Sequence, residues 1–372
     1  MTQSLYEYVA SIYKSLPYED FPLSKEAIEQ IRANPFEQMV NDDGACLKLI
    51  RSCLDFQSKV ITDSRNRASH ILVTWLLGIG LGKHFKLDEL GSEFEDGSYQ
   101  KLWLQSALLH DYGYFLKETS DEGLTIEEIS GDYALLTDDY DGVLSCLNGL
   151  SGSKKFHSYF TYSYKEIISY YAYAQYLHQK YPESGSNAEK NDHGIVGACV
   201  AFNSFCQSAV KAKANAPHYG IIQTQKIACM IAASHNIFKS GDKDADEVYK
   251  QYGLADLLST SAVRITKENQ LLLLMSLVDT IECTKRFSQR RNPSAYLQQA
   301  TTLKYVDITT DDGIELDFSR LSTYIAKERK SEDMGKLLLR HVNALRGIST
   351  WTVFSAMDHK EGDSDYIVRI SL

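Results

Sequence analysis

The sequence lacks the marks of a disulfide-bonded or membrane-spanning protein. Its seven cysteines are odd in number, form no C-x-x-C pair and have mostly apolar neighbours, so we expect buried, reduced thiols. Its longest apolar runs, Ile71 to Leu81 and Leu271 to Val278, fall short of the ~20 residues that a bilayer-spanning helix needs. The start, M-T-Q-S-L-Y-E-Y, has no basic segment followed by an apolar one. We therefore expect a cytoplasmic protein without a membrane partner.

Excess positive charge is also missing. The formal net charge is -10 at pH 7, from 39 Lys and Arg against 49 Asp and Glu. Because nucleic-acid binding depends on neutralising phosphates with Lys and Arg, this balance argues against extended nucleic-acid binding but allows a local basic pocket. Hydrophobic residues at 44% and charged residues at 24% are ordinary for a globular chain, which can therefore bury a large core.

The length of 372 residues and the order of the patterns predict a mainly α protein in three parts. Residues 1–60 show helical spacing, and we expect N-terminal helices that pack on the core. Residues 61–295 contain the long apolar helical runs, interrupted by an insertion at 116–190 that is rich in acidic residues and tyrosine. Residues 296–372 change pattern and predict a small α+β domain of two hairpins and a helix.

Two stretches carry the prediction of that C-terminal domain. From Leu303 to Phe318 two alternating runs flank Asp-Asp-Gly, a strong hairpin signal. A helix is expected around Leu321 to Leu345. The runs W-T-V-F-S-A-M and D-Y-I-V-R-I-S-L then flank a charged turn and predict a second hairpin. We expect this α+β unit to act as an oligomerisation or partner-binding module, if the protein has one.

The chemistry of the chain centres on the stretch from Leu102 to Phe115, L-W-L-Q-S-A-L-L-H-D-Y-G-Y-F. An apolar, helix-like run ends there in adjacent His110 and Asp111. Neighbouring side chains point in different directions, so this pair can place an imidazole nitrogen and a carboxylate oxygen around one ion. A histidine at a helix C-terminus is also favoured by the helix dipole, so the pair alone is weak evidence for a metal site. The other histidines strengthen that evidence.

Three further histidines and one aspartate lie within or beside apolar segments. His70 follows Arg67 by one turn in an apolar helix, His193 opens a helix of small residues, and His235 ends another apolar helix. A lone histidine of this kind is more often a hydrogen-bonded core residue than a ligand. Asp279 follows a continuous apolar run, where a carboxylate needs a cation or several donors. The set as a whole predicts a metal centre.

The ordered pattern of H, HD, H, H and D over residues 60–290 resembles the HD superfamily of metal-dependent phosphohydrolases, and in particular its dinuclear branch. The resemblance implies an HD-type helical bundle with the small α+β unit as a C-terminal appendage. It also implies two divalent metal ions, drawn from Mn, Fe, Ni, Co, Zn and Mg. The implied ligands are His70, His110, Asp111 and Asp279 for one ion and His193 and His235 for the other, with Asp111 bridging.

The resemblance implies a phosphohydrolase or phosphodiesterase that acts on a nucleotide or another small phosphoester through metal-activated water. Asp111 and Arg67 are the expected catalytic residues, and Arg67 can also hold a phosphate bidentately. Many phosphodiesterase-type members read H-D-x-G-K, whereas Tyr114 stands in place of that lysine here, which argues against a standard cyclic-dinucleotide phosphodiesterase. Glu282, one turn after Asp279, is expected to support a ligand, with a role as a ligand itself as the alternative. The candidate substrate-binding residues are Arg67, Lys239, Lys285, Arg286 and Tyr114.

Two other functions remain open from the sequence. The same arrangement resembles the diiron oxygenases related to this superfamily, and the missing lysine together with Tyr112 and Tyr114 beside the site fits that reading. The third reading is a non-catalytic sensor or scaffold that binds a nucleotide without turnover, with the α+β unit as its interaction module. Metal content and aerobic and anaerobic assays separate these readings.

Overall fold

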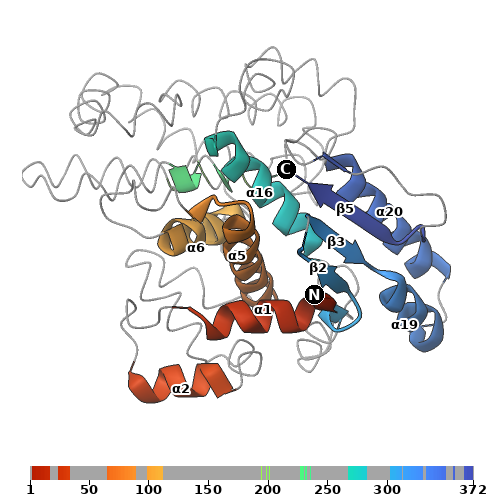
Figure 1. Cartoon of the computed structure of the whole chain (residues 1–372), viewed down its shortest axis with the longest axis horizontal. Helices are drawn as coiled ribbons and strands as arrows, with labels where there is room; N and C mark the ends of the chain where they lie inside the picture. Colours follow the sequence, from red (N-terminus) through yellow and green to blue (C-terminus); the bar gives the residue numbers. More distant parts are fainter. Residues whose placement is uncertain are drawn as a thin grey trace, which may run out of the picture. The chain divides into compact units, whose positions relative to one another are not determined.

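The structure is a computed structural model, shown in Figure 1, and it is mainly helical with a small antiparallel sheet. Some positions inside helices, residues 65–69 among them, are described by their main chain alone. The described residues are 2–16, 24–33, 65–88, 99–111, 267–282, 302–311, 313–329, 332–348, 355–356 and 364–371, together with 194, 198, 201, 227–229, 231, 232 and 235.

The chain divides into two compact units. The first contains residues 1–85 and 277–372, and the second contains residues 86–276. The division falls within helix α16 (Lys267–Ile281), between Ser276 and Leu277. Among the described residues, no helix combines the length and the apolar character that crossing a bilayer requires.

The sheet of the first unit has five antiparallel strands in the order β1-β2-β3-β5-β4. The hairpin predicted around Asp-Asp-Gly is present: β2 and β3 pair with Ile308 opposite Leu316, and Gly313 takes a φ of 143°, which favours glycine. Leu316 in turn lies opposite Val368 of β5. The strands are β1 (Thr2–Ser4), β2 (Asp307–Thr309), β3 (Ile314–Asp317), β4 (Ser355–Ala356) and β5 (Ile367–Ser371).

The two faces of the sheet differ as period-two alternation requires. Ile308, Leu316 and Val368 are buried on one face. On the other face Arg369 donates from Nε to the Glu315 carboxylate at 2.6 Å, a cross-strand ion pair. Strand β1 was not anticipated by the sequence analysis: Thr2 lies opposite Thr309, so the start of the chain completes the sheet that the C-terminal residues build.

Helix α1 (Leu5–Lys14) follows β1 directly. Ser4 is its N-cap and forms a capping box with Glu7, which places a carboxylate at the positive end of the helix dipole. These hydrogen bonds from Ser4, main chain first, lower the pKa of Glu7. Helix α1 packs against α5 (Arg65–His84), where Gly80 allows the close approach: a Cβ there would overlap Ile12 and lie 2.7 Å from the Tyr8 hydroxyl. Helix α2 (Lys25–Ala33) also belongs to this unit.

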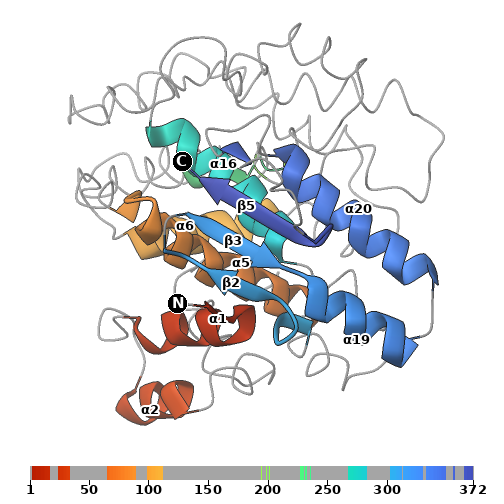
Figure 2. The same cartoon turned by 45° about the vertical axis from the view of Figure 1, so that its right-hand side comes forward.

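Two helices, α19 (Ser319–Arg329) and α20 (Glu332–Ile348), occupy the span for which the sequence analysis expects one. Figure 2 shows α20 alongside β5. Arg346 of α20 stabilises this contact. Its guanidinium donates to the main-chain carbonyls of Asp365 and Ile367 at 3.0 and 2.8 Å. The predicted single helix is therefore corrected to a helix pair.

The second unit contains α6 (Tyr99–His110) and most of α16 among its described elements. Helix α6 is buried almost all round, with Leu102, Trp103 and Leu104 in succession inaccessible to solvent. A helix without a polar face belongs in a core, which agrees with its apolar sequence. Burial and the nearby Asp88 carboxylate raise the pKa of Tyr99, whose ring stacks on Trp103.

Candidate metal centre

His70 of α5 lies between two carboxylates at the C-terminal end of α16. Its Nδ1 is 2.6 Å from Oε2 of Glu282, and its Nε2 is 3.2 Å from Oδ1 of Asp279. Glu282 has no exposed side-chain surface and Asp279 keeps 14% of its own exposed. Such burial of two carboxylates is costly unless each meets a donor or a cation, and the imidazole supplies part of that compensation.

The sequence places these residues by two apolar runs. Ile71 to Leu77 of α5 and Leu274 to Val278 of α16 are buried, so the polar residues at their ends are held at the edge of the same core. Asp279 and Glu282 are three residues apart, a spacing that puts both on one face at the end of α16. Both carboxylates can therefore reach one imidazole.

His110 ends α6 and is inaccessible to solvent. Its Nδ1 is hydrogen-bonded to the carbonyl oxygen of Ala107 in the preceding turn, and its Nε2 lies 3.5 Å from Oδ1 of Asp111. Because a carbonyl oxygen accepts only, Nδ1 carries a proton, which in the neutral ring leaves the lone pair on Nε2. The exposed fraction of Asp111 is only 2%, so its carboxylate also lies in the interior.

His235 is held in the same way as His110. Its Nδ1 donates to the carbonyl oxygen of Ala232 at 2.5 Å, and its ring meets that of His110 edge to face, with centroids 5.1 Å apart. A bond between Ser276 Oγ and the main-chain carbonyl of His235, 2.8 Å long, fixes the backbone there. In the neutral form of both rings, a proton on Nδ1 leaves the lone pair on Nε2, the atom through which such a ring can bind a metal.

Gly194 lies against His235. A Cβ built on this residue would stand 2.5 Å from Cε1 and 2.6 Å from Nδ1 of His235, and 2.6 Å from the carbonyl oxygen of Ala232. Real carbon atoms do not approach this closely, so a glycine leaves the room that the imidazole occupies. The small residues noticed after His193 in the sequence have this packing reason at Gly194.

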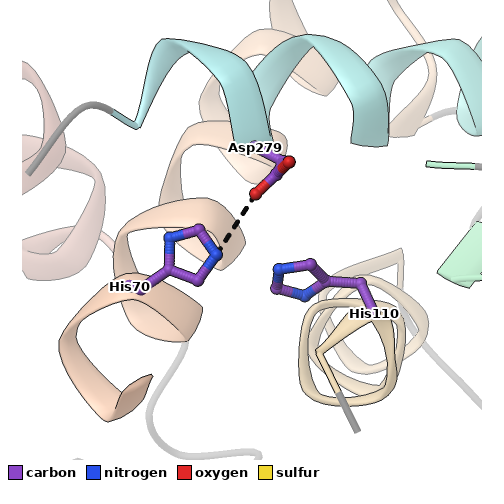
Figure 3. A group of neighbouring side chains, drawn as sticks. All are labelled: His70, His110 and Asp279. Carbon is purple, nitrogen blue, oxygen red and sulfur yellow. Dashed lines mark ion pairs between the residues drawn. The ribbon is translucent and has the colours of Figure 1, made fainter. Parts of the chain in front are cut away.

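His70, His110 and Asp279 form a group that could hold a metal ion. Each offers one ligand atom, and these atoms all lie within 4.8 Å of one another. Figure 3 shows the three side chains converging, with the ion pair between His70 and Asp279 drawn as a dashed line. Two imidazole nitrogens and a carboxylate oxygen, without thiolate, suit divalent first-row transition metals, so the donor set fits the predicted kind of ion.

The remaining predicted site residues are of two kinds: those that the structure describes and those that lie outside the described residues. Asp111 and His235 are buried near this group but are not members of it. Arg67 belongs to α5, but its side chain is not among those described. The predicted roles of Asp111, His235 and Arg67 stay predictions. The insertion at 116–190 lies outside the described residues. Predicted residues that lie outside the described residues are His193, Tyr112, Tyr114, Lys239, Lys285 and Arg286.

Two contributors were only partly visible in the sequence. Glu282 was expected to support a ligand or to act as one, and in the structure its carboxylate contacts His70. Ser276 was not considered, although a serine within L-L-L-L-M-S-L-V-D is a polar interruption that calls for a buried partner. Its partner is the carbonyl of His235, 41 residues earlier.

Comparison with known proteins returned no matching family model, no matching curated protein and no matching solved structure.

Proposed function

We propose that the protein is a metal-dependent phosphohydrolase or phosphodiesterase that acts on a nucleotide or a similar small phosphoester, with a centre of the HD type. The observation that carries the proposal is the group of His70, His110 and Asp279, whose ligand atoms lie within 4.8 Å of one another in an apolar interior. No sulfur ligand belongs to this group, which favours hydrolytic metals over a structural zinc site of the thiolate type.

The proposed roles follow from donor type and burial. His70, His110, Asp111 and Asp279 would hold one divalent cation, and His235, with the predicted His193, would hold a second to which Asp111 bridges. Such cations polarise phosphoryl oxygens and lower the pKa of water, so that hydroxide is available near neutral pH. The carbonyls of Ala107 and Ala232 accept the Nδ1 proton of His110 and His235, so that in the neutral rings Nε2 carries the lone pair that would bind a cation.

Substrate binding is proposed for basic residues near the ligands in the sequence. Arg67, one turn before His70, is the first candidate for a bidentate phosphate contact. Lys239, Lys285 and Arg286 stand within a few residues of His235 or Asp279, and Tyr114 follows Asp111 by three positions. A negatively charged substrate needs such groups because the protein as a whole carries a charge of -10.

The test is metal analysis of protein purified without chelators, followed by a phosphatase and phosphodiesterase substrate panel with Mn, Ni, Co and Mg. We expect bound transition metal, hydrolysis that requires it, and loss of both in Asp279→Asn. Glu315→Gln removes a carboxylate that is paired with Arg369 in the sheet and is the matched control. Metal-free protein with no hydrolysis would overturn the proposal.

The same panel separates the other readings of the sequence. An activity that needs dioxygen and disappears under anaerobic conditions would replace the hydrolase with a diiron oxygenase. Tight nucleotide binding without product would replace it with a sensor or scaffold. Both outcomes would leave the metal centre in place and change only the chemistry assigned to it.

A further inference from the structure

The ring of His70 faces a carboxylate at each nitrogen, and the two distances are unequal. Nδ1 lies 2.6 Å from Glu282 and Nε2 lies 3.2 Å from Asp279. The Glu282 side chain is completely buried, whereas that of Asp279 keeps 14% of its surface exposed. The shorter contact is therefore made by the carboxylate that is shielded from solvent, since no water reaches it to take the place of the imidazole.

An ionised carboxylate has acceptor atoms only, so the hydrogen in the contact with Glu282 belongs to Nδ1 of His70. In neutral imidazole a proton on Nδ1 leaves the lone pair on Nε2. The two ring nitrogens point away from each other, so Glu282 cannot reach an ion that Nε2 and Asp279 bind. Glu282 therefore acts on an ion only through His70.

The main chain holds Glu282 in this position. It follows the last residue of α16, and its N–H donates to the carbonyl of Val278 at 2.9 Å, which continues the helical turn by one residue. The rigid end of a helix buried in the core thus carries both the carboxylate that orients the imidazole and, one turn earlier, the carboxylate beside Nε2. A flexible loop would not fix the ring so closely.

We propose that Glu282 is a positioning residue that keeps the proton of His70 on Nδ1 and aims Nε2 at the ion. The inference rests on the proposed metal centre and adds to it a carboxylate that does not touch the ion. Partners of this kind fix the tautomer and the orientation of a ligating histidine and raise its basicity, and losing them weakens metal binding roughly 10- to 100-fold.

The first test measures Mn²⁺ binding to the full chain. Glu282→Leu keeps an apolar side chain of similar size but offers no acceptor, so we expect its dissociation constant to rise roughly 10- to 100-fold. Glu282→Gln keeps an amide oxygen that can accept from Nδ1, so its loss should be smaller. Glu315→Gln, the same substitution at the Arg369 pair, should leave Mn²⁺ binding unchanged. Wild-type affinity in Glu282→Leu overturns the proposal.

The second test needs no metal. Long-range ¹H–¹⁵N spectra of chelator-treated protein with ¹⁵N-histidine, with His70 assigned from the signals lost in His70→Gln, report which ring nitrogen carries the proton. We expect a protonated Nδ1 in the wild type whose proton resonance moves in Glu282→Gln and not in Glu315→Gln. An unprotonated Nδ1 in the wild type, or a resonance that does not move in Glu282→Gln, overturns the inference.

The two tests keep the two proposals apart. If the wild type binds no Mn²⁺ or other metal, the proposed function fails, yet the spectra still decide whether Glu282 sets the proton of His70. If metal binds and catalysis occurs but Glu282→Leu binds Mn²⁺ as the wild type does, only the positioning role fails. Should Glu282→Leu not fold, the wild-type and Glu282→Gln spectra carry the decision.

Discussion

The imidazole of His70 is held by a carboxylate 212 residues further along the chain, whereas those of His110 and His235 are each held by a carbonyl three residues earlier. The second arrangement needs little more than one helical turn. The first needs α5 and the end of α16 to be packed together. Orientation of a ligand through local geometry survives small rearrangements of the core, while orientation through a distant partner depends on the whole unit being folded.

Removal of the imidazole should therefore cost more at position 70 than at position 235. His70→Ala removes a buried imidazole that contacts both Glu282 and Asp279, which we expect to lower the free energy of unfolding by about 3 to 5 kcal/mol. His235→Ala leaves a helical carbonyl less satisfied and removes the ring that packs on His110, and we expect it to lower the free energy of unfolding by about 1 to 3 kcal/mol. Denaturant unfolding of the metal-free proteins measures both. Equal losses of unfolding free energy in the two variants would contradict the difference between the two positions.

Gly194→Ala tests how tightly the locally held ring is confined. A methyl group there must displace the His235 imidazole or the Ala232 carbonyl, and overpacking of this kind costs about 1 to 3 kcal/mol. Gly335→Ala in α20 is the control, since a Cβ at that position meets nothing within 4 Å. It should stabilise by about 0.5 to 1 kcal/mol because alanine favours a helix. A stabilised Gly194→Ala would contradict the close packing.

Two buried serines allow distant and local partners to be compared for a single hydrogen bond. Ser276 donates to the distant carbonyl of His235, whereas Ser106 donates to Leu102 one turn earlier in its own helix. We expect Ser276→Ala to lower the free energy of unfolding by about 1 kcal/mol. Ser106→Ala should change the free energy of unfolding little, because alanine gains helix propensity and the Leu102 carbonyl keeps its place in the helix. Thermal unfolding of both variants decides, and a larger loss in Ser106→Ala would reverse the comparison.

His84, at the end of α5, is a histidine outside the metal group. Burial lowers its pKa from 6.5, so the unfolded chain binds its proton more readily than the folded protein does. The stability that this group contributes is present above pH 6.5 and falls as the pH drops through 6.5 toward the lower folded value. The denaturation midpoints of wild type and His84→Gln, compared from about pH 7.5 to about pH 5, should show a small extra loss in the wild type. A gain on acidification would contradict it.

The sequence was sufficient for the parts of the structure that have local causes. The apolar runs before His110 and Asp279 predicted buried helices, and three of the predicted ligands, His70, His110 and Asp279, lie in one group that could hold a metal ion. The Asp-Asp-Gly turn predicted the β2–β3 hairpin because only a few residues are needed to form it. The mainly helical character followed from the same periodicities.

The parts that the sequence could not supply depend on distant partners. Glu282 could be suspected from its spacing to Asp279, but nothing in the sequence indicates that its acceptor atoms face His70. Strand β1 has three residues and no alternation long enough to read, so its pairing with β2 is set by tertiary structure. The helix pair α19 and α20 was missed because no Gly or Pro separates them.

The pairing of Thr2 with Thr309 has a consequence for synthesis on the ribosome. At about 5 to 20 residues per second, the nascent chain carries β1 for on the order of 15 to 60 s before the complementary strand emerges. During that interval the backbone groups of Thr2 to Ser4 have no β2 to pair with, and the Val306 carbonyl that receives the Leu5 amide does not yet exist. Co-translational folding of this sheet is therefore a late event. We expect chaperone protection of the emerging α1 to affect the yield of folded protein more than the stability of the protein once it is folded.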